Sequence, residues 1–146
     1  MKKLIKGVSI FCISMLVGCE SAEMHEPETE LVYLEGGTFP AEYVVLVTPD
    51  IEAAAMYVRE NLDSTIQACD FDGAAGLTFE GIDNKPGIIW LESARIPEDV
   101  PVINHELLHA TLNTMRYSGV SLSDSSEEAY AYQFQYYSNQ FYNKIK

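Results

Sequence analysis

The spacing of apolar positions beyond residue 30 alternates between the period of strands and the longer period of helices. From Ile51 to about Cys69 apolar side chains recur every three or four residues, which predicts a helix. β-branched, aromatic or uniformly apolar runs bounded by Gly, Pro or Asp predict strands at 31–35, 43–48, 77–80 and 88–91. A second helix opens near Pro97 or Pro101 and ends at about Ser118, and a third spans roughly 126–143. The pattern predicts an α+β domain, a small mixed sheet packed on about three helices.

The first 19 residues have the organisation of an export signal. Three lysines, at positions 2, 3 and 6, precede an apolar run from Val8 to Val17. This run is too short for a permanent membrane span, so it predicts the central segment of a signal peptide. It ends in Leu16-Val17-Gly18-Cys19, which resembles the bacterial lipobox, where the chain is cut before a cysteine that becomes lipidated. The alternative is an ordinary secretory leader with an incidental cysteine.

The lipobox resemblance divides the chain into three parts. Residues 1–18 are then a lipoprotein signal peptide that is removed, and Cys19 carries the lipid that holds the protein on a membrane. Residues 19–30 are acidic and interrupted by Pro27, so we expect a flexible tether before a folded domain at 31–146. The resemblance implies the bacterial cell envelope, and Glu20 after the cysteine favours the outer membrane over the inner one.

The charge balance limits the classes of partner. Acidic residues outnumber basic ones by 22 to 9, for a formal net charge of −13. Loss of the leader removes three lysines and no acid, which leaves six basic residues and a charge of about −16. Such a surface repels phosphate backbones, so we expect no nucleic-acid partner.

The strongest chemical signal is His105-Glu106-Leu107-Leu108-His109, an H-E-x-x-H sequence within a predicted helix. Residues four apart on a helix differ by about 40° in direction, so both imidazoles project from one face and can share a zinc ion. Glu106 lies where a carboxylate can take a proton from water and pass it to a leaving amine. The alternative is a pair of core histidines on an amphipathic helix.

This motif resembles that of the zincin metallopeptidases. In their gluzincin branch the third zinc ligand is a glutamate on the following helix, often as E-x-x-A followed by a polar or aromatic residue, and Glu128–Tyr132 matches that form. The resemblance implies a zinc ion held by His105, His109 and Glu128. Glu127 stays open as the alternative ligand, because Ser125–Glu128 is also a capping-box sequence and one glutamate could serve as the cap.

By motif the resemblance covers about residues 87–137, and the chain is similar to short metallopeptidases of phages and prophages. It implies a minimal zincin-like fold, a zinc cofactor and a peptide or protein substrate. In zincins the strand before the motif helix forms the sheet edge to which extended peptides add, so residues 87–92 are expected at that edge.

Three functions remain open at this point. The first is a zinc-dependent metallopeptidase that hydrolyses peptide bonds with Glu106 as the general base. The second is a non-catalytic envelope lipoprotein that keeps a zincin-like metal-binding fold. The third is an amidase that acts on peptidoglycan stem peptides with the same metal chemistry. The presence of Glu106 together with both histidines favours catalysis over its loss.

Overall fold

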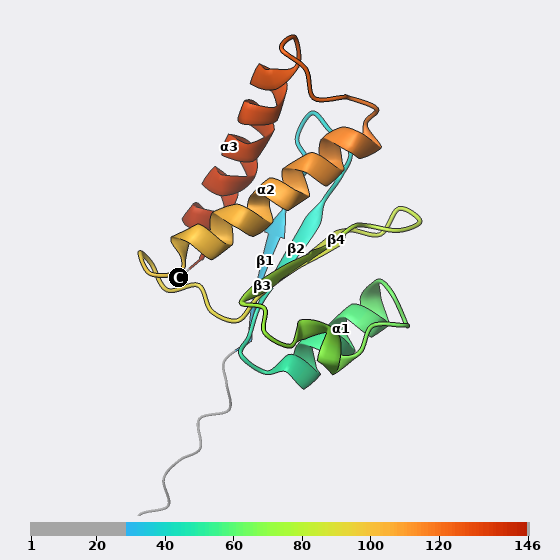
Figure 1. Cartoon of the computed structure of the whole chain (residues 1–146), viewed down its shortest axis with the longest axis vertical. Helices are drawn as coiled ribbons and strands as arrows, with labels where there is room; N and C mark the ends of the chain where they lie inside the picture. The colour runs from blue at the N-terminus through green and yellow to red at the C-terminus, as the bar shows by residue number, and fades with distance from the viewer. Residues whose placement is uncertain (1–28, 146) are drawn as a thin grey trace, which may run out of the picture.

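A computed structural model of the chain describes residues 29–145, which form a four-stranded sheet with helices on both faces (Figure 1). The elements in chain order are β1 (Glu30–Leu34), β2 (Tyr43–Val47), α1 (Ile51–Asn61), the 3-10 helix η1 (Ala68–Phe71), β3 (Gly76–Phe79), β4 (Gly87–Leu91), α2 (Val100–Tyr117) and α3 (Glu127–Lys144). A mixed sheet with three α-helices confirms the predicted α+β class. Most elements begin and end close to their predicted bounds.

The strands lie in the order β1-β2-β4-β3, with β4 parallel to β2 and both edge strands antiparallel to their neighbours. β4 is therefore an interior strand, and the expectation that residues 87–92 form the sheet edge is wrong. All five residues of Gly87–Leu91 are buried, as expected for an apolar strand covered on both faces and paired on both sides. β3 forms the edge instead, and it contacts α2.

Different helices cover the two faces of the sheet (Figure 1). Successive side chains of β2 point to opposite faces, as a strand requires. Val45 packs with Leu107 of α2 and Tyr137 of α3, whereas Leu46 packs with Trp90 and the apolar side of α1. The helix that carries the H-E-x-x-H motif is thus fixed between one sheet face and α3.

Helix α1 begins as predicted, with Asp50 as its N-cap, but it ends at Asn61 rather than near residue 69. Asp63 accounts for the difference. Its Oδ1 accepts hydrogen bonds from the backbone N–H of Thr65 at 2.9 Å and from the hydroxyl of Thr65 at 2.7 Å, a local pattern that competes with helix. The apolar periodicity continues beyond the end of α1 because Ile66 packs against the core cluster that contains the buried side chains of α1.

Candidate metal centre

The two motif histidines lie side by side on the exposed face of α2. Their Nε2 atoms are 3.0 Å apart, and their rings are 4.6 Å apart between centroids with an interplanar angle of 80°. Two nitrogens that share a tetrahedral zinc at about 2.0–2.1 Å are about 3.3 Å apart, so this spacing fits a ligand pair. It also suits a hydrogen bond between the two rings. Because His105 and His109 are exposed, the interpretation as core histidines is wrong.

Glu106 occupies a different environment from the histidines on either side of it. Only 5% of its surface is exposed, and its Oε2 accepts a hydrogen bond from the Thr78 hydroxyl at 2.7 Å. The same hydroxyl lies 3.1 Å from the backbone carbonyl of Glu106. Gly76 makes room for this arrangement, because a Cβ there would come within 2.8 Å of Glu106 Cγ. The carboxylate is thus held against edge strand β3, about 60° around the helix from His109.

The predicted third ligand is not brought to this pair. Residues 29–145 contain no group of three or more His, Cys, Asp and Glu side chains placed to hold one metal ion. Glu128 is exposed in the first turn of α3, whereas the opposite end of α3 lies beside the motif, because the Tyr142 hydroxyl donates to Asn104 Oδ1 at 3.0 Å. Glu128 lies about 21 Å along the helix axis from Tyr142. The set His105, His109 and Glu128 therefore stays a prediction.

The start of α3 does not form the capping box expected of Ser125–Glu128. Ser126 is the N-cap, and its side chain makes no capping hydrogen bond. Its hydroxyl instead donates to the carbonyl of Ser121 at 2.6 Å and accepts from the backbone N–H of Ser123 at 2.9 Å. The hydroxyl thus organises the loop before the helix rather than the helix itself. Glu127 is exposed in the same turn as Glu128.

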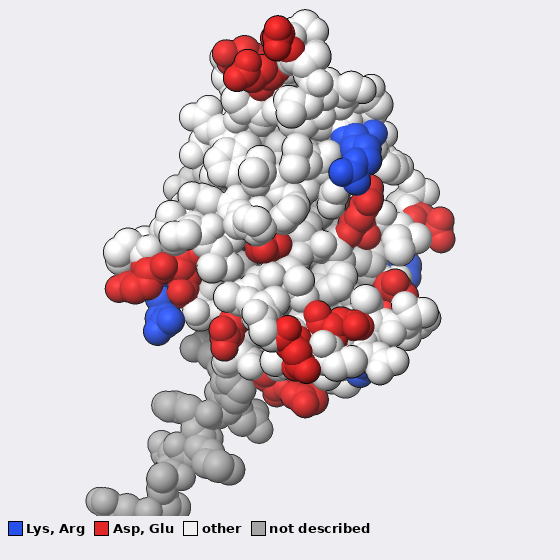
Figure 2. Space-filling model, viewed as in Figure 1, with Lys and Arg blue, Asp and Glu red and all other residues white. Residues whose placement is uncertain are grey.

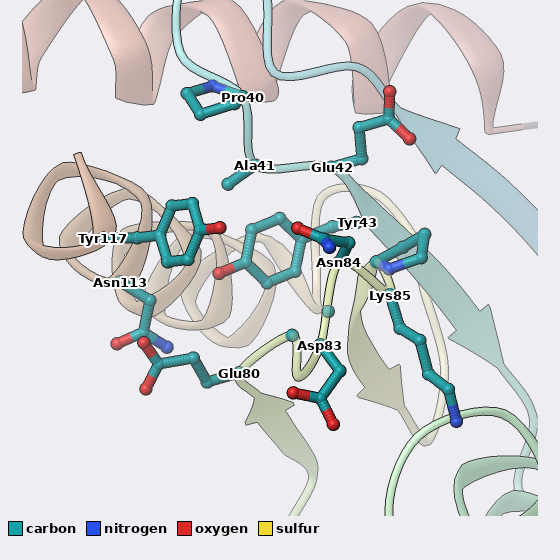
Figure 3. A pocket seen from close by; sticks show the side chains of 13 residues that line it. Pro40, Ala41, Glu42, Tyr43, Glu80, Asp83, Asn84, Lys85, Asn113 and Tyr117 are labelled. Atoms are coloured by element: carbon teal, nitrogen blue, oxygen red, sulfur yellow. The ribbon is translucent and has the colours of Figure 1, made fainter.

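A small cavity lies beside the C-terminal part of α2, which follows the motif in the same helix (Figure 3). Its volume is about 140 Å³, and side chains from β2, from the end of β3 and from α2 converge on it: Tyr43, Glu80, Asn113 and Tyr117. Asn113 comes one helical turn after His109, and Tyr117 comes two turns after it. Sequence reasoning missed this cavity, because its residues are far apart along the chain and none belongs to a recognisable motif.

The phenol of Tyr43 forms the inner wall of the cavity. Tyr43 is 3% exposed, and its ring meets that of Tyr137 edge to face with centroids 5.7 Å apart. Gly87 permits this placement, because a Cβ there would collide with the Tyr43 ring. Burial, followed by the nearby Tyr137, raises the pKa of Tyr43 well above the usual 10.0. The Tyr43 hydroxyl therefore stays neutral at physiological pH.

The opposite side of the cavity is formed by the connection between β3 and β4. A backbone hydrogen bond from Lys85 N to Ile82 O, 2.9 Å long, closes a tight turn there. Its two central residues, Asp83 and Asn84, have φ of 52° and 65°. Positive φ at both central positions is the geometry of a type I′ hairpin turn, which Asn and Asp tolerate better than other non-glycine residues. This turn fixes the position of Glu80 relative to α2.

The surface of the described part of the chain carries the acidic excess counted in the sequence. Figure 2 shows several separate clusters of carboxylates on the visible face, which is otherwise mostly uncharged, and lysine and arginine at isolated points. Within residues 29–145, one ion pair forms, between Arg95 Nε and Asp99 Oδ2 at 3.4 Å. The Ser93 hydroxyl, which donates to the same carboxylate, and then the Arg95 backbone N–H lower the pKa of Asp99.

The predicted signal peptide, Cys19 and the tether up to residue 28 lie outside the described residues. In the range 29–145 no helix combines the length and the apolar character needed to cross a membrane. Comparisons of the chain with protein-family models, with curated proteins and with solved structures find no match.

Proposed function

We propose that this chain is a zinc-dependent metallopeptidase in which His105 and His109 hold the metal and Glu106 is the general base. One observation carries the proposal. Two exposed imidazoles with Nε2 atoms 3.0 Å apart lie on the same helix as a carboxylate that is 5% exposed and held by a hydrogen bond. The ligand pair and the base are therefore adjacent on one helix, and the base is held in place before substrate arrives.

When bound, zinc lowers the pKa of a coordinated water to about 7 and polarises a substrate carbonyl. The protein side chains supply the proton transfer. Glu106 takes the proton of the attacking water and then delivers it to the amine that leaves when the peptide bond breaks. The Thr78 hydroxyl occupies Oε2 of Glu106, so Oε1 is the oxygen that takes up the proton.

The position of Glu106 against β3 supports a peptide as substrate. β3 is an edge strand, and in the described part of the chain it pairs with β4 on one side. An extended peptide can add to a free strand edge through backbone hydrogen bonds. Because Thr78 of β3 contacts Glu106, a peptide on that edge would pass close to the base.

The third metal ligand in this proposal is a carboxylate from the first turn of α3, Glu128 or its neighbour Glu127. Either one requires α3 to shift or repack against α2, because the first turn of α3 is far from the histidine pair and the helix is held by the buried Tyr137 and Phe141. The serine-rich connection at 121–126 is exposed over most of its length, so it can follow such a shift.

A non-catalytic metal-binding lipoprotein is the second candidate, and it is favoured because residues 29–145 place no third ligand beside the two histidines. Catalytic zinc sites ordinarily have three protein ligands, whereas a pair alone can bind a metal weakly. Hydrolysis separates the two candidates. An amidase on peptidoglycan stem peptides would use the same residues and differ only in substrate.

The test is hydrolysis of a mixed peptide pool and of purified peptidoglycan stem peptides by the zinc-loaded protein, compared with its Glu106→Gln variant. Glu106→Gln keeps the shape of the side chain and removes the base. We expect it to retain zinc and to lose about 100-fold or more in rate, the usual contribution of general-base catalysis. Glu60→Gln, an equal charge change on α1, is the matched control. Equal rates for Glu106→Gln and the wild type would overturn the proposed mechanism.

A further inference from the structure

The cavity beside the motif has the size of one side chain. Its volume is about 140 Å³. A cavity of about 150 Å³ accommodates one benzene molecule, whereas pockets for larger ligands measure roughly 300–1,000 Å³. The cavity therefore suits a single residue of a peptide whose backbone lies outside it.

The charge of the residues that line the cavity favours one kind of substrate side chain. Three acidic residues line the cavity: the Glu80 carboxylate reaches toward Asn113, and Asp83 and Glu42 add two further carboxylates around it (Figure 3). Lys85 is the one cation among the lining residues, and its ammonium group points away from the centre. The local potential is negative, so a substrate carboxylate would be repelled and a cation attracted.

The walls suit a cation that ends a long apolar stem. The hydroxyls of Tyr43 and Tyr117 point toward one another across the cavity (Figure 3). Tyr43 is 3% exposed and Tyr117 61% exposed, so one ring is fixed in the core and the other forms the solvent-facing wall. Their faces can pack against a methylene chain or a cation, and their oxygens can accept hydrogen bonds from an ammonium or guanidinium group.

The cavity lies a short distance along α2 from the histidine pair. Asn113 lies one turn beyond His109, which is about 6 Å along the helix axis. Residues of an extended peptide advance about 3.3 Å each. A side chain in the cavity would therefore belong to a residue one or two positions from the bond that lies at the histidine pair.

We propose that this cavity binds the side chain of a lysine or arginine close to the cleaved bond, with Glu80 as the group that pairs with its charge. This inference extends the proposed peptidase function by naming a substrate class. The binding itself needs neither zinc nor hydrolysis, so it can be tested separately from the proposed function.

The first test is a nuclear magnetic resonance titration of the zinc-free protein with blocked single amino acids, following the backbone amides of Gly81 and Gly87. We expect saturable shifts with N-acetyl-lysine methylamide and with the arginine analogue, and far weaker ones with the norleucine and glutamate analogues. Glu80→Gln should weaken lysine binding by roughly three- to tenfold, the range for one partly solvated charge pair. Glu60→Gln, which removes an equal charge from α1, should leave it unchanged.

Equal binding of norleucine and lysine, preferential binding of glutamate, or no shift with any analogue would each overturn the proposal. The second test compares kcat/KM for peptides that differ only in lysine or norleucine near the scissile bond. Glu80→Gln should lower the lysine-to-norleucine ratio by a similar factor, and an unchanged ratio would contradict the proposal. Absence of hydrolysis with intact lysine binding would instead count against the peptidase function alone.

Discussion

The Thr78 hydroxyl donates a hydrogen bond of 2.7 Å to Oε2 of Glu106, which links the sheet edge to the carboxylate of the H-E-x-x-H motif. Thr78 lies at the middle of β3, and Glu106 lies two turns into α2. This contact joins two elements separated in the chain by the whole of β4. Through this hydrogen bond, Thr78 positions the proposed base.

Replacing Thr78 with valine should slow the reaction without releasing the metal. Valine keeps the shape of threonine but cannot donate to Oε2, which leaves a buried carboxylate oxygen without its partner. We expect kcat to fall about tenfold and the free energy of unfolding to fall by about 1–3 kcal/mol. Zinc content should stay at the wild-type level.

Thr78→Ser separates positioning from packing, because serine restores the hydroxyl and omits the methyl group. It should recover most of kcat in steady-state assays, even if some stability is lost. If Thr78→Ser were as slow as Thr78→Val, the hydroxyl would not be what positions Glu106.

The sequence was sufficient for the sheet strands, for the position of α2 and α3 and for the histidine pair, because these depend on local spacing. A helix places residues four apart on one face, so the approach of His105 and His109 follows from α2 alone. The edge strand could not be predicted in this way. Strand order depends on long-range pairing, and the apolar run at 88–91 is compatible with any well-covered position in a sheet.

The position of Glu128 also depends on long-range packing that the local sequence does not encode. Its motif form predicts a ligand on the helix that follows the H-E-x-x-H helix, but the distance to the histidines depends on how α3 crosses α2 and on the path of residues 118–126. No local pattern encodes that crossing. The cavity around Tyr43 was missed for a related reason, since its walls come from three elements whose meeting point is fixed only by tertiary packing.

Two buried phenols make the free energy of unfolding depend on pH in the alkaline range. Burial raises the pKa of Tyr43 and of Tyr137 above the usual 10.0. The unfolded chain therefore loses these protons at lower pH than the folded protein does. Their stabilising contribution is complete below about pH 10 and is lost as pH rises toward the raised folded values.

We expect the free energy of unfolding in urea to decline above about pH 10 by up to about 1.4 kcal/mol per pH unit for each buried phenol. Tyr43→Phe and Tyr137→Phe should each reduce this slope. Tyr132→Phe, which removes a hydroxyl from a 67% exposed side chain, is the matched control. A wild-type stability that stays constant up to strongly alkaline pH would contradict the assigned burial effect.

The lipobox sequence makes a separate prediction about the N-terminus. Cys19 should incorporate a fatty-acid label in bacterial cells, and the protein should fractionate with membranes, with the outer membrane favoured. Cys19→Ala should abolish both, since the thiol is the lipid acceptor. Cys12→Ala removes a cysteine from the predicted leader, so it should label normally. Undiminished labelling of Cys19→Ala would refute the lipoprotein assignment.

The zinc content of the purified protein, measured after metal stripping and titration, tests the central claim most directly. We expect one zinc ion per wild-type chain and none above background for His109→Ala, while His25→Ala, which changes the remaining histidine, keeps its zinc. Loss of zinc in either Glu127→Ala or Glu128→Ala would identify the third ligand. A wild-type protein that binds no more zinc than His109→Ala would contradict the account, because the two imidazoles of α2 would then hold no metal.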